Sequence, residues 1–168
     1  MEIQSTPYLS FQALLVKWKK RGGTIDMFRT LIVEDSTFYR QLLKETLTGQ
    51  FPSIEISEAR SGEEALEMIQ TSLPDIIFMD IKLPGESGLE ITKKIKARHP
   101  DISIIIITSY DLLEYREAAK QYKANHFLSK GTTTTENILT LVKSILSNRN
   151  IDLNGHDPKG RSDDSLKR

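Results

Sequence analysis

Short strand-like segments alternate with helix-like segments along most of this chain. The strand-like segments are rich in isoleucine, leucine and valine, and they lie at 31–33, 54–56, 76–79, 102–107 and 126–128. Between them, apolar residues recur three or four positions apart, which is the spacing of one face of a helix. Residues 76–79 are apolar throughout, as in a central strand, and 102–107 is the most hydrophobic of the segments. Residues 54–56 alternate like an edge strand. The pattern predicts five strands and five helices.

Capping residues mark where several of these helices begin. Ser36 is expected to cap the first helix, and the spacing Ser/Thr-x-x-Glu of a capping box occurs at Ser61–Glu64, Ser87–Glu90 and Thr133–Glu136. The third helix is expected to end at His99-Pro100, because a residue before proline disfavours helical geometry.

Strict alternation of strands and helices predicts an α/β fold with helices on both faces of a parallel sheet. An edge position for the second strand and a central one for the third favour the flavodoxin-like, doubly wound order 2-1-3-4-5. The folded domain is expected to span 28–148. Residues 1–27 are predicted to be an extension, partly disordered or a short helix, and 149–168 a disordered polar tail.

Composition narrows the possible environments and partners. The 168 residues suit one domain, and 23 basic residues balance 23 acidic ones. Zero net charge provides no long-range attraction to nucleic acid or an anionic membrane. Without cysteine there is no disulfide or thiolate metal site, and no stretch reaches the roughly 18 apolar residues of a membrane span. We expect a cytoplasmic protein that binds neither membrane nor nucleic acid directly.

Three carboxylates follow two of the predicted strands. Asp80 comes directly after 76–79, and Glu34 with Asp35 follows the first strand. Parallel strands end at one edge of a sheet, so we expect the three acids to meet there. Acids could also serve only to complement a helix dipole. Clustered carboxylates repel one another unless a cation lies between them, and hard oxygen ligands suit Mg²⁺.

A hydroxyl and an amine are expected at the same edge. Thr108 ends the fourth strand and Lys130 follows the last one. Alone, the threonine could be a helix cap and the lysine a solvated surface residue. Together with Asp80 they suit a phosphoryl group, with the aspartate as a nucleophile that forms an acyl phosphate.

Four motifs together resemble the receiver domain of bacterial two-component response regulators. They are LIVED (31–35), PDIIFMDIKLPGESG (74–88), IIIITS (104–109) and FLSK (127–130), and the resemblance covers about 28–148. It implies that Asp80 accepts a phosphoryl group. It also implies that Mg²⁺ is held by Asp35, Asp80 and the backbone carbonyl of Lys82, with Glu34 acting through water.

The resemblance further assigns the switch and the partners. Thr108 and Lys130 would hold the phosphoryl oxygens, and Phe127 would be the aromatic switch residue. A sensor histidine kinase or a phosphotransfer protein would be the donor. The fourth and fifth helices would contact an unknown protein target or a second copy in a homodimer. The domain would be a switch with weak self-dephosphorylation, not an enzyme.

Three positions depart from the family pattern. Gly131 replaces the usual proline after the lysine, which predicts a trans peptide and a somewhat looser lysine. The segment Lys123-Ala124-Asn125 lacks the glycine often found before the last strand. Phe127 has no hydroxyl, so packing alone would drive its movement.

The sequence can also be compared with what other functions would require. A phosphatase with an aspartate nucleophile would have a second aspartate two residues after the first, where this chain has Lys82. A nucleotide-binding protein would need a glycine-rich turn in place of Glu34-Asp35-Ser36. A truncated transcriptional regulator without its output domain, or a phosphorylation-independent binding module, are the alternatives within the family.

Overall fold

The computed structural model describes residues 28–153. Predictions for 1–27 and 154–168 lie outside the described residues. The strands are β1 (Phe28–Val33), β2 (Ile54–Ala59), β3 (Ile76–Met79), β4 (Ser103–Thr108) and β5 (His126–Ser129). The helices are α2 (Thr37–Gln50), α3 (Gly62–Thr71), α4 (Gly88–Arg98), α5 (Leu113–Gln121) and α6 (Thr135–Leu153).

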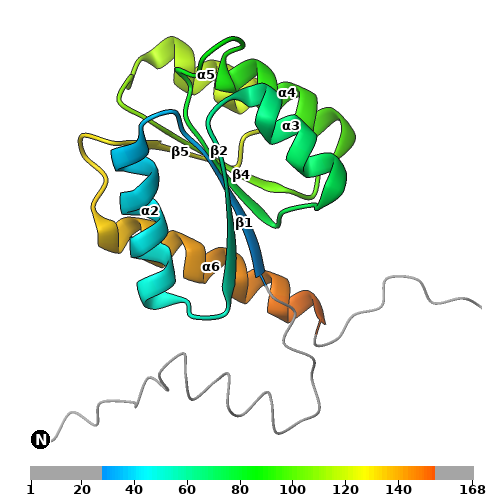
Figure 1. Cartoon of the computed structure of the whole chain (residues 1–168), viewed down its shortest axis with the longest axis vertical. Coiled ribbons are helices and arrows are strands. Elements are labelled where there is room, and N and C mark those ends of the chain that lie inside the picture. The colour runs from blue at the N-terminus through cyan, green and yellow to red at the C-terminus, as the bar shows by residue number, and fades with distance from the viewer. Residues whose placement is uncertain (1–27, 154–168) are drawn as a thin grey trace, which may run out of the picture.

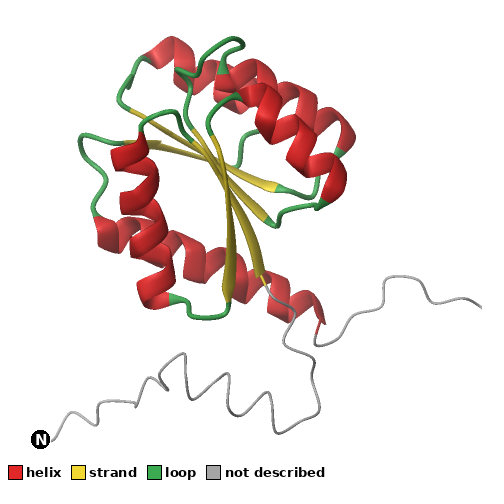
Figure 2. Ribbon diagram, in the orientation of Figure 1, coloured by secondary structure: helices red, strands yellow, loops and turns green. Residues whose placement is uncertain are grey.

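The strands form one parallel sheet in the order β2-β1-β3-β4-β5 (Figure 1). This confirms the predicted topology, including the edge position of β2 and the central position of β3. Helices cover both faces, with α3, α4 and α5 on one side and α2 and α6 on the other (Figure 2).

Each face of the sheet has its own hydrophobic core. Leu31, Ile77 and Met79 point toward α3 and α4, whereas Ile32 and Phe78 point toward α2 and α6. Successive residues of a strand face opposite sides, so β3 must be apolar at every position, and all four of its residues are buried. Burial on both faces fixes the register of β3 and therefore the position of the residue that follows it.

The predicted caps of the first two helices are present. Ser36 Oγ accepts a hydrogen bond from the backbone of Tyr39, and Ser61 Oγ accepts one from the backbone of Glu64. The carboxylate of Glu64 accepts from the backbone N–H of Arg60 instead of closing the box on Ser61.

The predicted box at the start of α4 forms only in part. Ser87 Oγ accepts from the backbone of Leu89. The carboxylate of Glu90 accepts instead from the Tyr122 hydroxyl on the neighbouring helix α5. A contact between helices therefore replaces the reciprocal local bond.

The last helix begins one residue later than the predicted cap implies, and it runs past the predicted end of the folded domain. The cap is Thr134, whose Oγ1 accepts from the backbone of Asn137, whereas the N–H of Thr133 belongs to the preceding turn and donates to Ser129. The helix continues to Leu153, five residues beyond the predicted boundary at 148. Asparagine costs only a few tenths of a kcal/mol in a helix, roughly 0.7 at most, and propagation of an existing helix is favourable.

The turn between α5 and β5 contains a strained residue. Lys123 has φ +64°, in the left-handed region that favours glycine. Its N–H donates to Lys120 O and the N–H of Ala124 donates to Ala119 O, the paired hydrogen bonds of a Schellman motif. Lys123 is thus the residue that adopts the conformation for which glycine is usual.

We expect Lys123→Gly to raise the free energy of unfolding by roughly 0.5–1 kcal/mol, because glycine adopts this φ without steric cost. Denaturant titration measures the change. Lys123→Ala is the matched control: it removes the same charge but keeps a Cβ, so it should give no gain. An equal gain in both variants would mean that charge, and not backbone strain, limits stability here.

Candidate functional site

Strand register brings the acidic residues together. Val33, the last residue of β1, is paired with Met79, the last residue of β3. The residues that follow them, Glu34 and Asp80, therefore leave neighbouring strands at the same level. The N–H of Asp80 donates to Val33 O at 3.0 Å, which extends the pairing into the site.

Glu34, Asp35 and Asp80 form one carboxylate cluster, as the sequence predicted. Each offers an oxygen within 4.8 Å of the others. Glu34 is 1% exposed and Asp80 5% exposed, whereas Asp35 is open to solvent. Such a donor set fits Mg²⁺, which uses one or two carboxylates and keeps several of its waters.

Lys130 reaches both buried acids from the end of β5. Its Nζ lies 2.8 Å from Asp80 Oδ2 and 2.5 Å from Glu34 Oε2. Its backbone N–H donates to Thr108 O at 2.8 Å, which ties the ends of β4 and β5 together. The predicted amine is therefore at the predicted edge, in contact with the predicted nucleophile.

Burial and charge perturb the proton affinities of this cluster. Burial raises the pKa of Glu34, and the nearby Asp80 adds to this, while the hydrogen bond from Lys130 only partly opposes it. Burial alone would lower the pKa of Lys130, but its hydrogen bonds to Asp80 and Glu34 outweigh burial and raise it. Lys130 therefore remains an ammonium, the form in which it neutralises negative charge.

The Asp80 carboxylate is held in a fixed orientation. Oδ1 accepts a 2.7 Å hydrogen bond from the N–H of Ile81, and Oδ2 faces Lys130. The start of α4 packs tightly against this loop, where the N–H of Gly88 donates to Ile81 O. A Cβ at position 88 would collide with the carbonyl oxygen of Asp80, so the close packing requires glycine.

Thr108 is fully buried at the same edge of the sheet. It is paired with Ser129, the residue before Lys130. Its Oγ1 accepts a 3.3 Å hydrogen bond from the N–H of Tyr110, so the hydroxyl also takes part in the turn that follows β4. The alternative considered from sequence was a helix cap, but α5 begins at Leu113 and its cap position is Leu112, so Thr108 does not cap that helix.

Two other predicted site residues make cation–π contacts. The Lys82 ammonium lies 5.2 Å from the ring centroid of Tyr110 and 5.5 Å from that of Tyr115. Phe127 is half-buried against the core that α5 covers, with the guanidinium of Arg116 4.6 Å from its ring centroid. Neither the carbonyl role of Lys82 nor the switch role of Phe127 is tested by these contacts.

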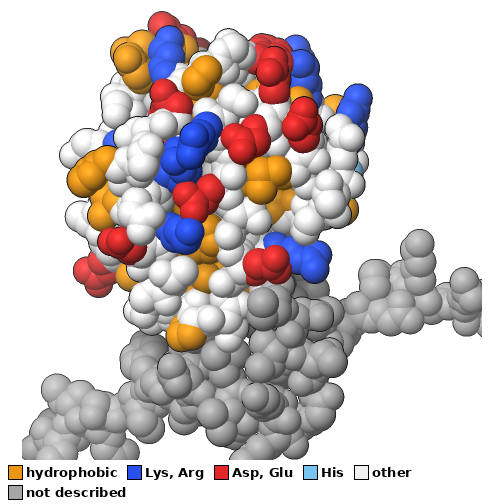
Figure 3. All heavy atoms as spheres, in the orientation of Figure 1, with side chains coloured by type: hydrophobic (Ala, Val, Ile, Leu, Met, Phe, Trp, Pro, Cys, Tyr) orange, Lys and Arg blue, Asp and Glu red, His pale blue; other side chains and the backbone are white. Residues whose placement is uncertain are grey.

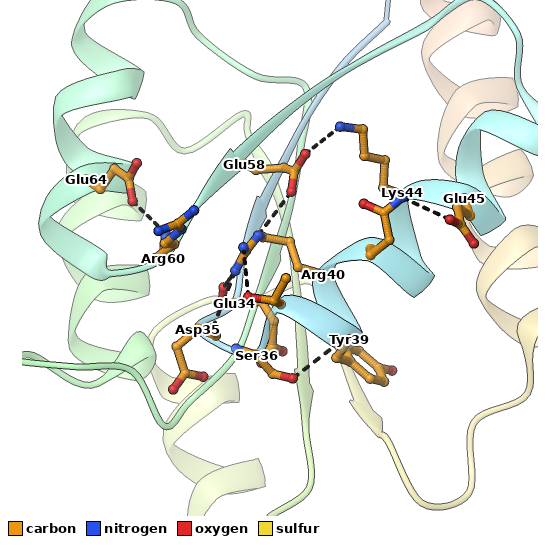
Figure 4. A network of polar contacts seen from close by, with 12 residues as sticks. Glu34, Asp35, Ser36, Tyr39, Arg40, Lys44, Glu45, Glu58, Arg60 and Glu64 are labelled. Carbon is orange, nitrogen blue, oxygen red and sulfur yellow. Dashed lines mark hydrogen bonds and ion pairs between the residues drawn. The ribbon is translucent and has the colours of Figure 1, made fainter.

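Arg40 supports the site and was missed from the sequence. This residue of α2 is 5% exposed, and its guanidinium donates to Glu34 O at 2.8 Å, to Asp35 O at 3.4 Å and to the Glu58 carboxylate at 3.0 Å (Figure 4). Lys44 also contacts Glu58, at 2.6 Å. The arginine thus fixes the turn that presents both acids, while the Asp35 carboxylate points away from it.

A sequence signal for Arg40 existed. It lies three residues before Leu43 and seven before Leu47, the two buried leucines of α2. A charged residue on the buried face of a helix is uncommon and requires partners.

The visible surface has no dominant charge. Lys and Arg side chains alternate with Asp and Glu, and hydrophobic side chains are scattered (Figure 3). This agrees with the zero net charge of the chain. Within 28–153, no helix has the length and apolar character that crossing a membrane requires.

We expect Arg40→Ala to lower the free energy of unfolding by roughly 2 kcal/mol, because two backbone carbonyls and a carboxylate lose a buried donor. Lys44→Ala is the control: it removes a half-exposed cation from the same Glu58 and should cost roughly 0–1 kcal/mol. Urea titration of the three proteins makes the comparison. Equal losses would mean that the turn does not depend on Arg40.

The same experiment has a pH dependence. Hydrogen bonding to Lys44, with further help from Arg40, lowers the pKa of Glu58 below its ordinary value of 4.5. The stabilisation that results is present above pH 4.5 and is lost as pH falls through the lowered pKa. The Lys44 and Arg40 variants should therefore lose less stability than the wild type on acidification below pH 4.5.

Known proteins are similar to part of this chain in sequence. The chain is 44% identical over 86 residues to a protein-glutamate methylesterase/protein-glutamine glutaminase of Pseudoalteromonas atlantica, covering 51% of this chain and 22% of that protein. It is 32% identical over 131 residues to the DNA-binding transcriptional regulator NtrC of Escherichia coli, covering 74% and 27%. The chain thus spans about a quarter of the length of these relatives.

A solved structure has a similar fold. The CheY-like receiver domain protein of Methanospirillum hungatei has a TM-score of 0.69 and 26% identity, covering 76% of this chain and 99% of that one. The family model of the response regulator receiver domain matches residues 30–143. This confirms the resemblance carried by the four motifs, and the chain belongs to the response regulator receiver domain family.

Proposed function

We propose that this chain is a phosphorylation switch in which Asp80 accepts a phosphoryl group in a Mg²⁺-dependent step. Phosphorylation and Mg²⁺ binding are typical of its family. The observation that carries the proposal is the Asp80 carboxylate, which is buried, oriented by Ile81, paired with Lys130 and adjacent to two further acids.

The chemistry is displacement at phosphorus. Asp80 Oδ2 forms a bond to the phosphorus of a donor such as a phosphohistidine, while the phosphorus–nitrogen bond breaks and the imidazole leaves with the electron pair and takes up a proton. Glu34, Asp35, Asp80 and the carbonyl of Lys82 would hold Mg²⁺. The ion supplies positive charge that stabilises the phosphoryl oxygens.

Lys130 and Thr108 would perform the remaining stabilisation. The Lys130 ammonium already contacts the nucleophile and would follow the added charge onto a phosphoryl oxygen. The Thr108 hydroxyl would give up its hydrogen bond from the Tyr110 N–H and donate to a second phosphoryl oxygen. Because Lys130 N–H is bonded to Thr108 O, the ends of β4 and β5 would move together.

That movement would reach the surface through β5. Phe127 lies two residues along the strand from Ser129 and packs beneath Arg116, which is paired with Asp111. Repacking of Phe127 would alter α5, the fourth helix of the domain, and the movement of β5 would be passed to α6, the fifth helix, which follows it. Two packings biased by an added charge constitute a switch.

The proposed donor is a sensor histidine kinase or a phosphotransfer protein. The proposed receptor of the signal is a protein target, or a second copy bound through α5 and α6, in the cytoplasm. We propose that the described domain is a switch with slow self-dephosphorylation and not an enzyme. A regulator with a separate output region is the second candidate, favoured by the greater length of the relatives.

Asp80→Asn should abolish phosphoryl uptake from acetyl phosphate and Mg²⁺, because the amide is not a nucleophile at phosphorus. Intact-protein mass spectrometry measures uptake. Asp101→Asn is the control, since Asp101 is an exposed aspartate before β4, at the opposite end of the sheet. Full labelling of Asp80→Asn would assign the phosphoryl group to another residue and defeat the proposal.

Asp35→Asn should weaken Mg²⁺ binding roughly tenfold or more, because a hard, charged oxygen ligand is lost while the fold is kept. Isothermal titration calorimetry measures the affinity directly. Mg²⁺ should also raise the melting temperature of the wild type more than that of Asp35→Asn. Identical affinities, with Asp101→Asn as the reference, would place the ion elsewhere.

A further inference from the structure

The Lys130 ammonium has a third neighbour besides the two acids. Its Nζ lies 4.3 Å from the centroid of the Tyr39 ring, within the distance of a cation–π contact. The ammonium is therefore enclosed by the carboxylates of Glu34 and Asp80 and by an aromatic face. Tyr39 comes from the first turn of α2, and Lys130 follows β5, so the contact joins the start of α2 to the loop after β5.

This contact falls where the chain lacks the proline that usually follows the lysine in this family. Gly131 follows Lys130 in place of proline, and no peptide bond among the described residues is cis. Sequence alone predicts a looser lysine there. The structure instead shows its ammonium held on three sides.

The tyrosine itself is firmly placed. Its backbone N–H donates to Ser36 Oγ at the cap of α2, and its ring packs against the core cluster that α2 shares with α6. Burial, and then the negative charge of Glu34 and Asp80, raises the pKa of its phenol to about 12. The hydroxyl therefore stays protonated at neutral pH, and the ring does not become a competing anion.

The two carboxylate contacts change when the site is used. In the proposed function Glu34 turns to the metal shell and Asp80 becomes an acyl phosphate, so Lys130 must exchange both of these partners. The ring face carries no net charge and takes no part in that exchange. It can therefore hold the ammonium throughout the reaction.

We propose that Tyr39 is a positioning residue that holds Lys130 over Asp80 by a cation–π contact and so replaces the restraint that a proline at position 131 would provide. The inference rests on the proposed function for its kinetic consequence, but the contact itself does not. Its ordinary alternative is that Tyr39 only fills space between α2 and the loop.

A series at position 39 separates these two roles. Tyr39→Phe keeps the ring face and loses only the hydroxyl, whereas Tyr39→Leu fills space without a ring. We expect phosphoryl uptake from acetyl phosphate and Mg²⁺ to stay within about twofold of wild type in Tyr39→Phe and to fall roughly threefold to tenfold in Tyr39→Leu. Intact-mass time courses measure the rates, and thermal unfolding checks each variant, with Tyr39→Met replacing any leucine variant that does not fold.

A second measurement needs no phosphorylation. Protons on the Lys130 side chain should be shifted upfield by the ring in the wild type and in Tyr39→Phe, and should move downfield in Tyr39→Leu, as seen by NMR with Lys130→Arg used for assignment. An unchanged Lys130 resonance, or uptake by the leucine variant at the wild-type rate, would overturn the inference. Equal losses in Tyr39→Phe and Tyr39→Leu would overturn it as well.

The two proposals fail separately. If wild-type protein takes up no phosphoryl group although Lys130 shows the ring shift, the proposed function is wrong but the Tyr39–Lys130 contact is still supported. If the wild type takes up the phosphoryl group but the Lys130 protons show no ring shift, the positioning role of Tyr39 is wrong and the proposed function is still supported.

Discussion

The packing of two buried carboxylates around one ammonium is the interaction on which the site depends. Glu34 and Asp80 are almost fully buried, and Lys130 bridges them. Removing such charges from water is costly unless they are paired. With Asp35 alongside, three carboxylates face a single ammonium, which leaves two formal negative charges. A divalent cation would match that excess, so the same residues that are costly to bury suit the Mg²⁺ of the proposed function.

The rest of the fold keeps this arrangement in place. Burial of β3 on both faces fixes the level at which Asp80 emerges, and the β1–β3 register brings Glu34 beside it. Arg40 holds the carbonyls of the acidic turn, and Gly88 lets α4 pack onto the Asp80 backbone. Each of these supports acts on the backbone of the loops and not on the carboxylate oxygens of Glu34 or Asp80.

The sequence predicted the features that depend on the spacing of apolar residues and on the position of a residue along a strand. Strand order, helix faces and the convergence of Glu34, Asp35, Asp80 and Lys130 all follow from parallel strands ending at one edge. It did not predict Thr134 as the last cap, because Thr133 has equal capping chemistry and only the turn from Ser129 decides between them. It also missed the role of Arg40 and the ring contact of Tyr39. The spacing of Arg40 from Leu43 and Leu47 indicates that it lies on the buried face of α2, but the groups that these two side chains reach depend on the tertiary fold.

Two of the three departures from the family pattern fall at the two ends of β5. Lys123 adopts a left-handed conformation before the strand, and Gly131 follows Lys130 after it. The first costs about 1 kcal/mol and lies at the end of the sheet away from the acids, so it affects stability without altering the nucleophile. The second lies within the site, where a flexible residue would let the Lys130 side chain move. Contacts with side chains from β1, β3 and α2 hold that lysine instead, so its position depends on tertiary packing more than on its own loop.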